Sequence, residues 1–79
     1  MSNIDLFLDA VVETFQVERS TIKDESTPDE IERWDSVTHM DLLARLEQAF
    51  KVNFDMEEIS EMQTIGMVKQ ILRKKGVEL

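Results

Sequence analysis

Cysteine is absent from the 79 residues of the chain, and histidine occurs only once. The lack of thiols excludes disulfides and cysteine nucleophiles, and it leaves a structural zinc site without its usual ligands. One histidine offers little for acid–base chemistry, so we expect no catalytic residues and no metal site, and an enzyme is the weakest function class. A chain of this length has room for one domain, residues 1–79, with a modest core.

Proline occurs once and glycine twice, and this scarcity favours helices over tight turns and hairpins. Apolar runs never approach the roughly 20 residues of a membrane span. The segment MSNIDLFLDA carries acids where a signal peptide requires bases. We therefore expect a cytoplasmic protein without stable membrane insertion, and we expect it to be a monomer.

Basic residues are in the minority: 9 Lys and Arg stand against 17 Asp and Glu, which gives a formal net charge of −8. The excess lies between Asp24 and Glu61, where twelve acids accompany three bases. Such a surface would repel phosphate backbones, which argues against nucleic acid as a partner. A basic protein partner and an acidic surface kept for solubility explain the charge about equally well.

Apolar residues recur with helical spacing at the start of the chain, which predicts a first helix capped by Ser2 or Asn3. Its apolar stripe comprises Ile4, Phe7, Leu8, Val11, Val12 and Phe15. The spacing is lost from Gln16 to Trp34, and this stretch predicts a long surface loop, a feature that is often functional. The expected anchors of the loop in the core are Ile22, Ile31 and Trp34.

A second helix is predicted from Asp35 or Ser36 to Phe50. Its expected core face comprises Leu42, Leu43, Leu46, Ala49 and Phe50. The flank between this face and the polar one is apolar too, and an apolar arc of this width suggests that part of it is left for a partner. That flank comprises Val37, Met40 and Ala44.

Two more helices follow in the pattern. Asp55 and Glu58 have capping-box spacing, which predicts a short third helix with an apolar face of Met56, Ile59 and Met62. Thr64 is positioned to cap a fourth helix, and Gly76 follows its basic last turn as a C-terminal stop. The predicted fold class is therefore all-α: a bundle of three main helices plus one short helix, with a long loop between the first two.

The chemically suggestive segment is Trp34-Asp35-Ser36-Val37, where the long loop meets the second helix. Unpaired N–H groups and the positive end of the helix dipole can hold a phosphate there. An Asp-Ser pair before an apolar run is also an ordinary N-cap, and on the dipeptide alone we favour that interpretation. The context of the whole chain reverses the preference.

The order of helix, long loop, Asp-Ser at the head of an acidic helix, short acidic helix and final helix resembles the acyl carrier protein family along essentially the whole chain. The resemblance implies that Ser36 accepts 4′-phosphopantetheine from coenzyme A, with Asp35 beside it shaping the approach. It also implies two kinds of partner: a phosphopantetheinyl transferase (holo-acyl-carrier-protein synthase) and acyl-loading and acyl-transfer enzymes that dock on the second helix. Such a carrier is a shuttle and not a catalyst, because the thiol of the arm is the reactive group.

The resemblance assigns two further sets of residues. The partner-docking face on the second helix comprises Val37, Met40, Asp41, Ala44 and Glu47, and we expect both acids to be exposed. If the cargo is a fatty or polyketide chain, we expect an acyl pocket inside the bundle, lined by Phe7, Val11, Leu42, Leu46, Phe50, Ile59, Met62, Ile65 and Val68. Fatty acid, polyketide and modified-lipid biosynthesis are the expected pathways.

Several residues depart from the usual family pattern and favour a specialised pathway over housekeeping fatty acid synthesis: Trp34, Val37, Thr38, His39 and Arg45. We expect Trp34 to anchor the loop with its N–H hydrogen-bonded, and His39 to be a packed or half-exposed residue at the rim of the core. Two alternatives stay open: a carrier of the same fold loaded with an amino acid or other small acid, and an unmodified helical interaction domain. Retention of the Asp35-Ser36 pair argues against the second alternative.

Overall fold

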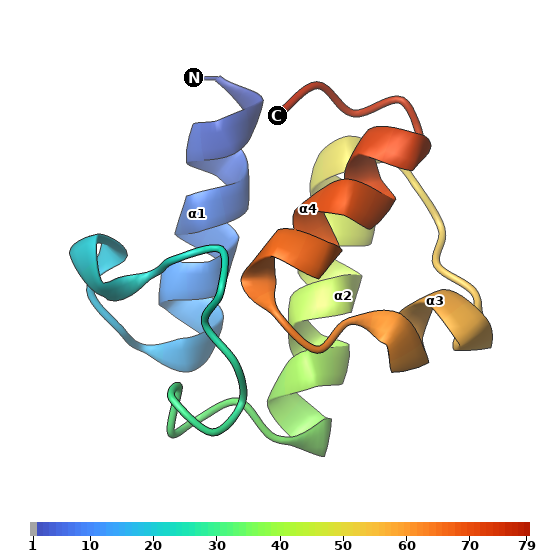
Figure 1. Ribbon diagram of the computed structural model, residues 1–79. Coiled ribbons are helices and arrows are strands. Elements are labelled where there is room, and N and C mark those ends of the chain that lie inside the picture. Colours follow the sequence, from blue (N-terminus) through green and yellow to red (C-terminus); the bar gives the residue numbers. More distant parts are fainter. Residues whose placement is uncertain (1) are drawn as a thin grey trace.

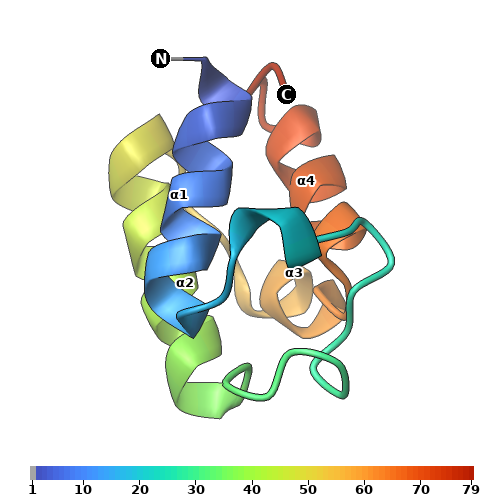
Figure 2. The ribbon, with the colours of Figure 1, turned by 90° about the vertical axis from the view of Figure 1, so that its left-hand side faces the viewer.

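A computed structural model describes residues 2–79 of the chain (Figures 1 and 2). Four α-helices, and no strand within these residues, confirm the all-α prediction, and a 3-10 turn, η1, was not predicted. The elements are α1 (Asn3–Phe15), η1 (Arg19–Thr21), α2 (Ser36–Phe50), α3 (Met56–Glu61) and α4 (Ile65–Lys74). In Figure 1, α1 descends while α2 and α4 ascend, so Ser36 lies at the end of the bundle opposite to the C-terminus.

Helix α1 begins where Ser2 caps it, because the Ser2 side chain accepts a hydrogen bond from the Asp5 N–H at 3.3 Å. The choice between Ser2 and Asn3 is thereby resolved. The helix ends at Gln16, which adopts the left-handed conformation at φ 54°. Phe7, Val11 and Phe15 of the predicted stripe are fully buried, and Ile4 and Leu8 are partly buried against the core. Val12 is half-buried.

Helix α2 supplies the centre of the core with Leu42, Leu43 and Leu46. Phe50 is partly buried against the same cluster. The prediction for Ala49 was wrong, because this residue is exposed. Ala49 lies at the edge of the apolar arc, and its single methyl group is too short to reach the core from there.

The caps of the last two helices confirm the prediction. Asp55 and Glu58 form a reciprocal capping box at α3, and the Thr64 hydroxyl accepts the Met67 N–H at 3.1 Å at α4. Gly76 follows α4 with a positive φ of 94°. The predicted apolar face of α3 was wrong for Met56, which is 80% exposed. Met56 is the first residue of a short helix, and its side chain lies outside the contact with the bundle.

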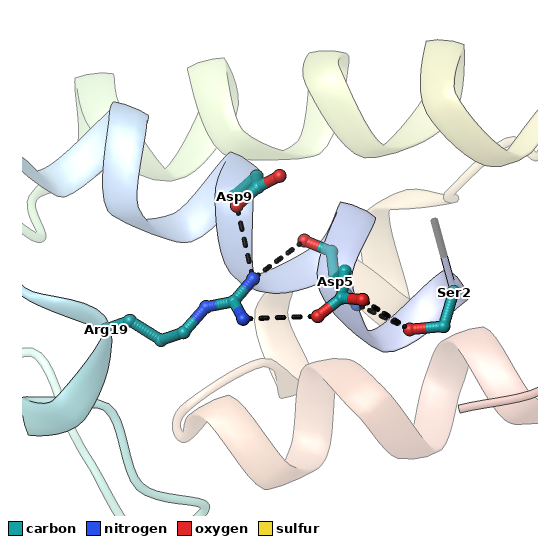
Figure 3. A network of polar contacts seen from close by, with 4 residues as sticks. All are labelled: Ser2, Asp5, Asp9 and Arg19. Carbon is teal, nitrogen blue, oxygen red and sulfur yellow. Dashed lines mark hydrogen bonds and ion pairs between the residues drawn. The ribbon is translucent and has the colours of Figure 1, made fainter.

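The long loop is held to α1 at its start by Arg19, the first residue of η1 (Figure 3). One guanidinium nitrogen contacts the Asp5 carboxylate at 3.1 Å, and the other contacts the Asp9 carboxylate at 3.2 Å. The second nitrogen also donates to the Asp5 carbonyl at 3.4 Å. This network fixes the direction in which the chain leaves α1.

The middle of the loop is hydrogen-bonded to the first turn of α4. The Ile65 N–H donates to the Ser26 carbonyl at 3.1 Å, and the Gly66 N–H donates to the Asp24 carbonyl at 2.8 Å. A Cβ atom on Gly66 would lie 3.1 Å from that same Asp24 oxygen, a contact so tight that the loop would have to shift by a few tenths of an ångström. The predicted anchors are confirmed: Ile31 and Trp34 are buried, and Ile22 is partly buried.

Candidate functional site

The head of α2 gives Asp35 and Ser36 different tasks. The Asp35 carboxylate is the N-cap and accepts hydrogen bonds from the N–H groups of Val37 and Thr38 at 2.9 and 3.0 Å. Ser36 is the first residue of the helix, its side chain is exposed, and its hydroxyl has no hydrogen-bond partner within residues 2–79. The N-cap that the Asp-Ser pair suggests is therefore Asp35, and the Ser36 hydroxyl is available for chemistry.

The capping contacts also fix the charge beside Ser36. The Thr38 N–H, the Thr38 hydroxyl and the Val37 N–H together hold the pKa of Asp35 below its usual value. The Thr38 hydroxyl in turn accepts the Asp35 N–H at 2.9 Å, which completes the capping box. The carboxylate is thus anionic at neutral pH and fixed in position next to the free hydroxyl.

An open groove of about 460 Å³ adjoins Ser36. Its walls come from the end of the loop, the first turns of α2, and α3 with the residue that follows it. They comprise Pro28, Trp34, Asp35, Ser36, His39, Met40, Ile59, Ser60 and Met62. The groove therefore combines an accessible hydroxyl at one side with a mostly apolar floor.

Trp34 and His39 form the polar link in this floor. The Trp34 indole N–H donates to His39 Nδ1 at 3.0 Å, and His39 Nε2 lies 3.2 Å from the Ile59 carbonyl oxygen. Because the indole can only donate, Nδ1 must be the acceptor, and the ring hydrogen must be on Nε2, pointing at Ile59. The expectation that Trp34 anchors the loop through a bonded N–H is confirmed, and so is the packed position of His39.

The predicted docking residues lie on one accessible flank of α2, with one exception. Val37 and Met40 are 78% and 53% exposed, and Ala44 and Asp41 are also exposed. The expectation of exposure was wrong for Glu47, which is half-buried and accepts the Phe54 N–H at 3.0 Å. Its partner is a backbone group in the loop after α2, which no spacing in the sequence indicates.

The residues predicted to line an acyl pocket do meet in one core. Seven of them are buried, and Phe50 and Ile59 are partly buried against them. Of the whole set, only Ile59 and Met62 also line the groove beside Ser36. The groove and the predicted pocket are therefore adjacent, and they share one short segment, α3 with the residue after it.

The acids Asp55 and Glu58 are engaged in the α3 cap, and Glu58 also pairs with Lys75 at 2.8 Å. No cluster of His, Asp and Glu suitable for a metal ion occurs in the described part of the chain. None of the helices in residues 2–79 has both the length and the apolar character needed to cross a bilayer.

The chain is similar to known proteins both in sequence and in fold. A family model described as "Phosphopantetheine attachment site" matches residues 5–72, a range that includes Ser36 and the groove. Comparison with curated proteins gave no match. The fold is similar to the solution NMR structure of holo acyl carrier protein from Geobacter metallireducens, with a TM-score of 0.75 and 24% identity, over 100% of this chain and 97% of that chain.

The family match supplies the chemistry that the fold alone does not. Carrier domains of this kind are not catalytic, and they interact with a phosphopantetheinyl transferase and with acyl-handling enzymes. The free hydroxyl at the head of α2 and the open groove beside it suit a covalent arm of this type. The chain therefore belongs to the acyl carrier protein family, and its prosthetic group is a covalently attached 4′-phosphopantetheine.

Proposed function

We propose that Ser36 is the residue that bears the arm, and that the chain carries acyl intermediates as thioesters to partner enzymes. The observation that carries this proposal is the exposed hydroxyl of Ser36, which has no hydrogen-bond partner among the described residues because Asp35 provides the cap. The other serine of the groove differs, since the Ser60 hydroxyl donates to the Glu57 carbonyl at 2.9 Å. Ser36 is therefore the better nucleophile of the two.

The covalent step joins Ser36 Oγ to the phosphorus of coenzyme A that carries pantetheine. The Oγ–P bond forms, the P–O bond to adenosine 3′,5′-bisphosphate breaks, and the hydroxyl proton leaves to a base of the transferase. Once attached, the arm supplies the thiol on which cargo is held. The chain itself contributes position: the head of α2 points the oxygen outward, and the fixed Asp35 carboxylate stays beside it.

Partner enzymes are proposed to dock on the exposed flank of α2. Val37, Met40 and Ala44 offer a small apolar centre next to Ser36, and Asp41 adds a negative charge at its border. A basic enzyme surface would match both features, because complementary charge speeds encounter and the apolar centre holds the complex. No catalytic residue of the chain itself is part of this proposal.

The test is an intact mass after incubation with coenzyme A, magnesium and a broad-specificity phosphopantetheinyl transferase. We expect the mass of one arm to be added to the wild-type protein and to Ser60→Ala, the matched control from the same groove. Ser36→Ala should gain nothing while keeping its helix content, because the hydroxyl makes no bond in the fold. An unmodified wild-type protein, or an arm on Ser36→Ala, would contradict the assignment.

A carrier of a small or polar acid is the second candidate, and one observation favours it. The groove beside Ser36 is open, whereas the residues of the predicted acyl pocket are packed in the core. A short cargo would find its place without any change in the bundle.

A further inference from the structure

We propose that His39 is a specificity-determining latch that separates the groove beside Ser36 from the core, so that cargo stays in the groove. This role rests on the proposed attachment of the arm at Ser36. It narrows the cargo to short or polar acyl groups and speaks against a long fatty chain.

His39 occupies the place on α2 where the core face meets the site. It precedes Leu42 and Leu43 by three and four residues, so it continues their buried face toward Ser36. A leucine at this place would extend the core, whereas the imidazole ends it with two hydrogen bonds. His39 is thus the boundary between the core face of α2 and the groove.

Both ring nitrogens of His39 have a hydrogen-bond partner. On the loop side, Nδ1 accepts the indole N–H of Trp34, and on the α3 side, Nε2 faces the Ile59 carbonyl at 3.2 Å. The latch therefore joins the end of the loop and the first turn of α2, which follow one another in sequence, to α3, where Ile59 lies 20 residues after His39. Movement of α3 away from α2 would break the contact with Ile59.

A stack of three aromatic rings also separates the groove from the core. Trp34 stacks on Phe15 with centroids 5.3 Å apart and on His39 with centroids 6.0 Å apart. Phe15 is fully buried and His39 lines the groove, so the three rings run from the core to the site. A cargo chain from Ser36 would have to displace this stack or pass beside it at Ile59 and Met62, the only predicted pocket residues that reach the groove.

The route past Ile59 is closed by a second tether. Glu58, next to Ile59, pairs with Lys75 at 2.8 Å, and this pair ties α3 to the C-terminal end of α4. Entry of a chain would leave the Nε2–H of His39 without its partner, and the Ile59 carbonyl would keep only the Met62 N–H at 3.3 Å. The loss of this hydrogen bond opposes the gain from burying methylene groups. Cargo in the groove contacts Met40, Ile59 and Met62 without breaking any of these bonds.

The test loads the protein with arms that carry acyl groups from acetyl to octanoyl and measures the melting temperature of each form. We expect a flat series for the wild type. His39→Asn should retain an acceptor for Trp34 but lose the reach to Ile59, and its melting temperature should rise with acyl length. His39→Gln, which can place a side-chain N–H near the Ile59 carbonyl, should restore the flat series.

Two results would overturn the latch: a rising series in the wild type, or a flat one in His39→Asn. A second measurement needs no variant: hydroxylamine cleavage of the wild-type thioesters, each relative to the same free acyl pantetheine. Equal relative rates for acetyl and octanoyl are expected, and protection of octanoyl would contradict the proposal. Failure of the proposed attachment is distinguished beforehand, because the wild-type protein would then show no added arm in its mass.

Discussion

Neighbouring residues at the head of α2 carry separate duties, one structural and one chemical. Asp35 satisfies two N–H groups of the first turn, and this leaves the Ser36 hydroxyl without a structural role. Folding and modification are thereby separated at the level of single side chains. A residue that had to do both would lose its cap when the phosphodiester formed.

Acid should weaken the fold through Asp35. Its pKa is lowered by the N–H of Thr38, so the folded state favours the carboxylate. The resulting stabilisation is complete above the usual pKa of the group and is lost as the pH falls through the lowered value. In Asp35→Asn the amide oxygen can still accept the N–H groups, but its contribution no longer depends on pH.

The measurement is urea unfolding of both proteins from neutral pH to about pH 3. The free energy of unfolding should fall less for Asp35→Asn than for the wild type. Some loss will remain, because hydrogen bonds from Ser2 and Lys75 lower the pKa of Asp5 and Glu58, respectively. Equal losses in the two proteins would show that the Asp35 charge contributes nothing to the cap.

For the head of α2, the sequence analysis predicted the Asp35-Ser36 pair but not the separate role of each residue. Asp and Ser are similarly good N-caps, so the pattern left open which of them caps α2. The partner of the Trp34 N–H, His39, and the Glu47–Phe54 bond were missed for a different reason. Each depends on how the loop ends are placed in three dimensions, and neither leaves a periodic signal.

At the scale of elements, the helices were predictable where their signals are local. The caps at Asp55 and Thr64 lie within three residues of the groups they bind, and both were predicted. The network of Arg19 with α1 was not predicted, because its partners Asp5 and Asp9 lie 14 and 10 residues earlier in the sequence. Long loops are poorly predicted for this reason: their contacts are tertiary.

Gly66→Ala should destabilise the junction between the loop and α4. Alanine is favoured over glycine in a helix by about 1 kcal/mol, so helix propensity alone predicts the opposite result. The added Cβ would lie 3.1 Å from the Asp24 carbonyl, which also accepts the Gly66 N–H at 2.8 Å. Chemical denaturation should give a lower free energy of unfolding, and a gain near the propensity value would show that the loop yields freely.

For the molecule as a whole, stability depends on a small core. Leu46 is fully buried where α2 meets the rest of the core cluster. Leu46→Ala should lower the free energy of unfolding by roughly 2–5 kcal/mol through lost burial and the cavity it leaves. Gln48→Ala, on the exposed side of the same helix, is the matched control and should change it little. Urea unfolding of the protein without its arm is the measurement, and equal stability of the two variants would contradict the assignment of the core.

The net charge of −8 should affect the rate at which the chain associates with partner enzymes. Asp41→Lys should slow transfer of the arm to Ser36 and reduce its dependence on salt, because the residue is exposed beside the docking flank. Glu47→Lys is unsuited to this test, since it would also remove the acceptor for the Phe54 N–H. Transfer rates that are unchanged in Asp41→Lys across a range of salt would place the docking face elsewhere.

Trp34 is the single tryptophan of the chain, and its indole lies between Phe15 and His39 at the border of the groove. Indole emission responds to hydrogen bonding and to the polarity around the ring. The protein therefore carries an intrinsic optical probe next to the residue that is proposed to bear the arm. Loading, unloading and enzyme docking can be followed in real time by fluorescence, without a dye attached to the carrier.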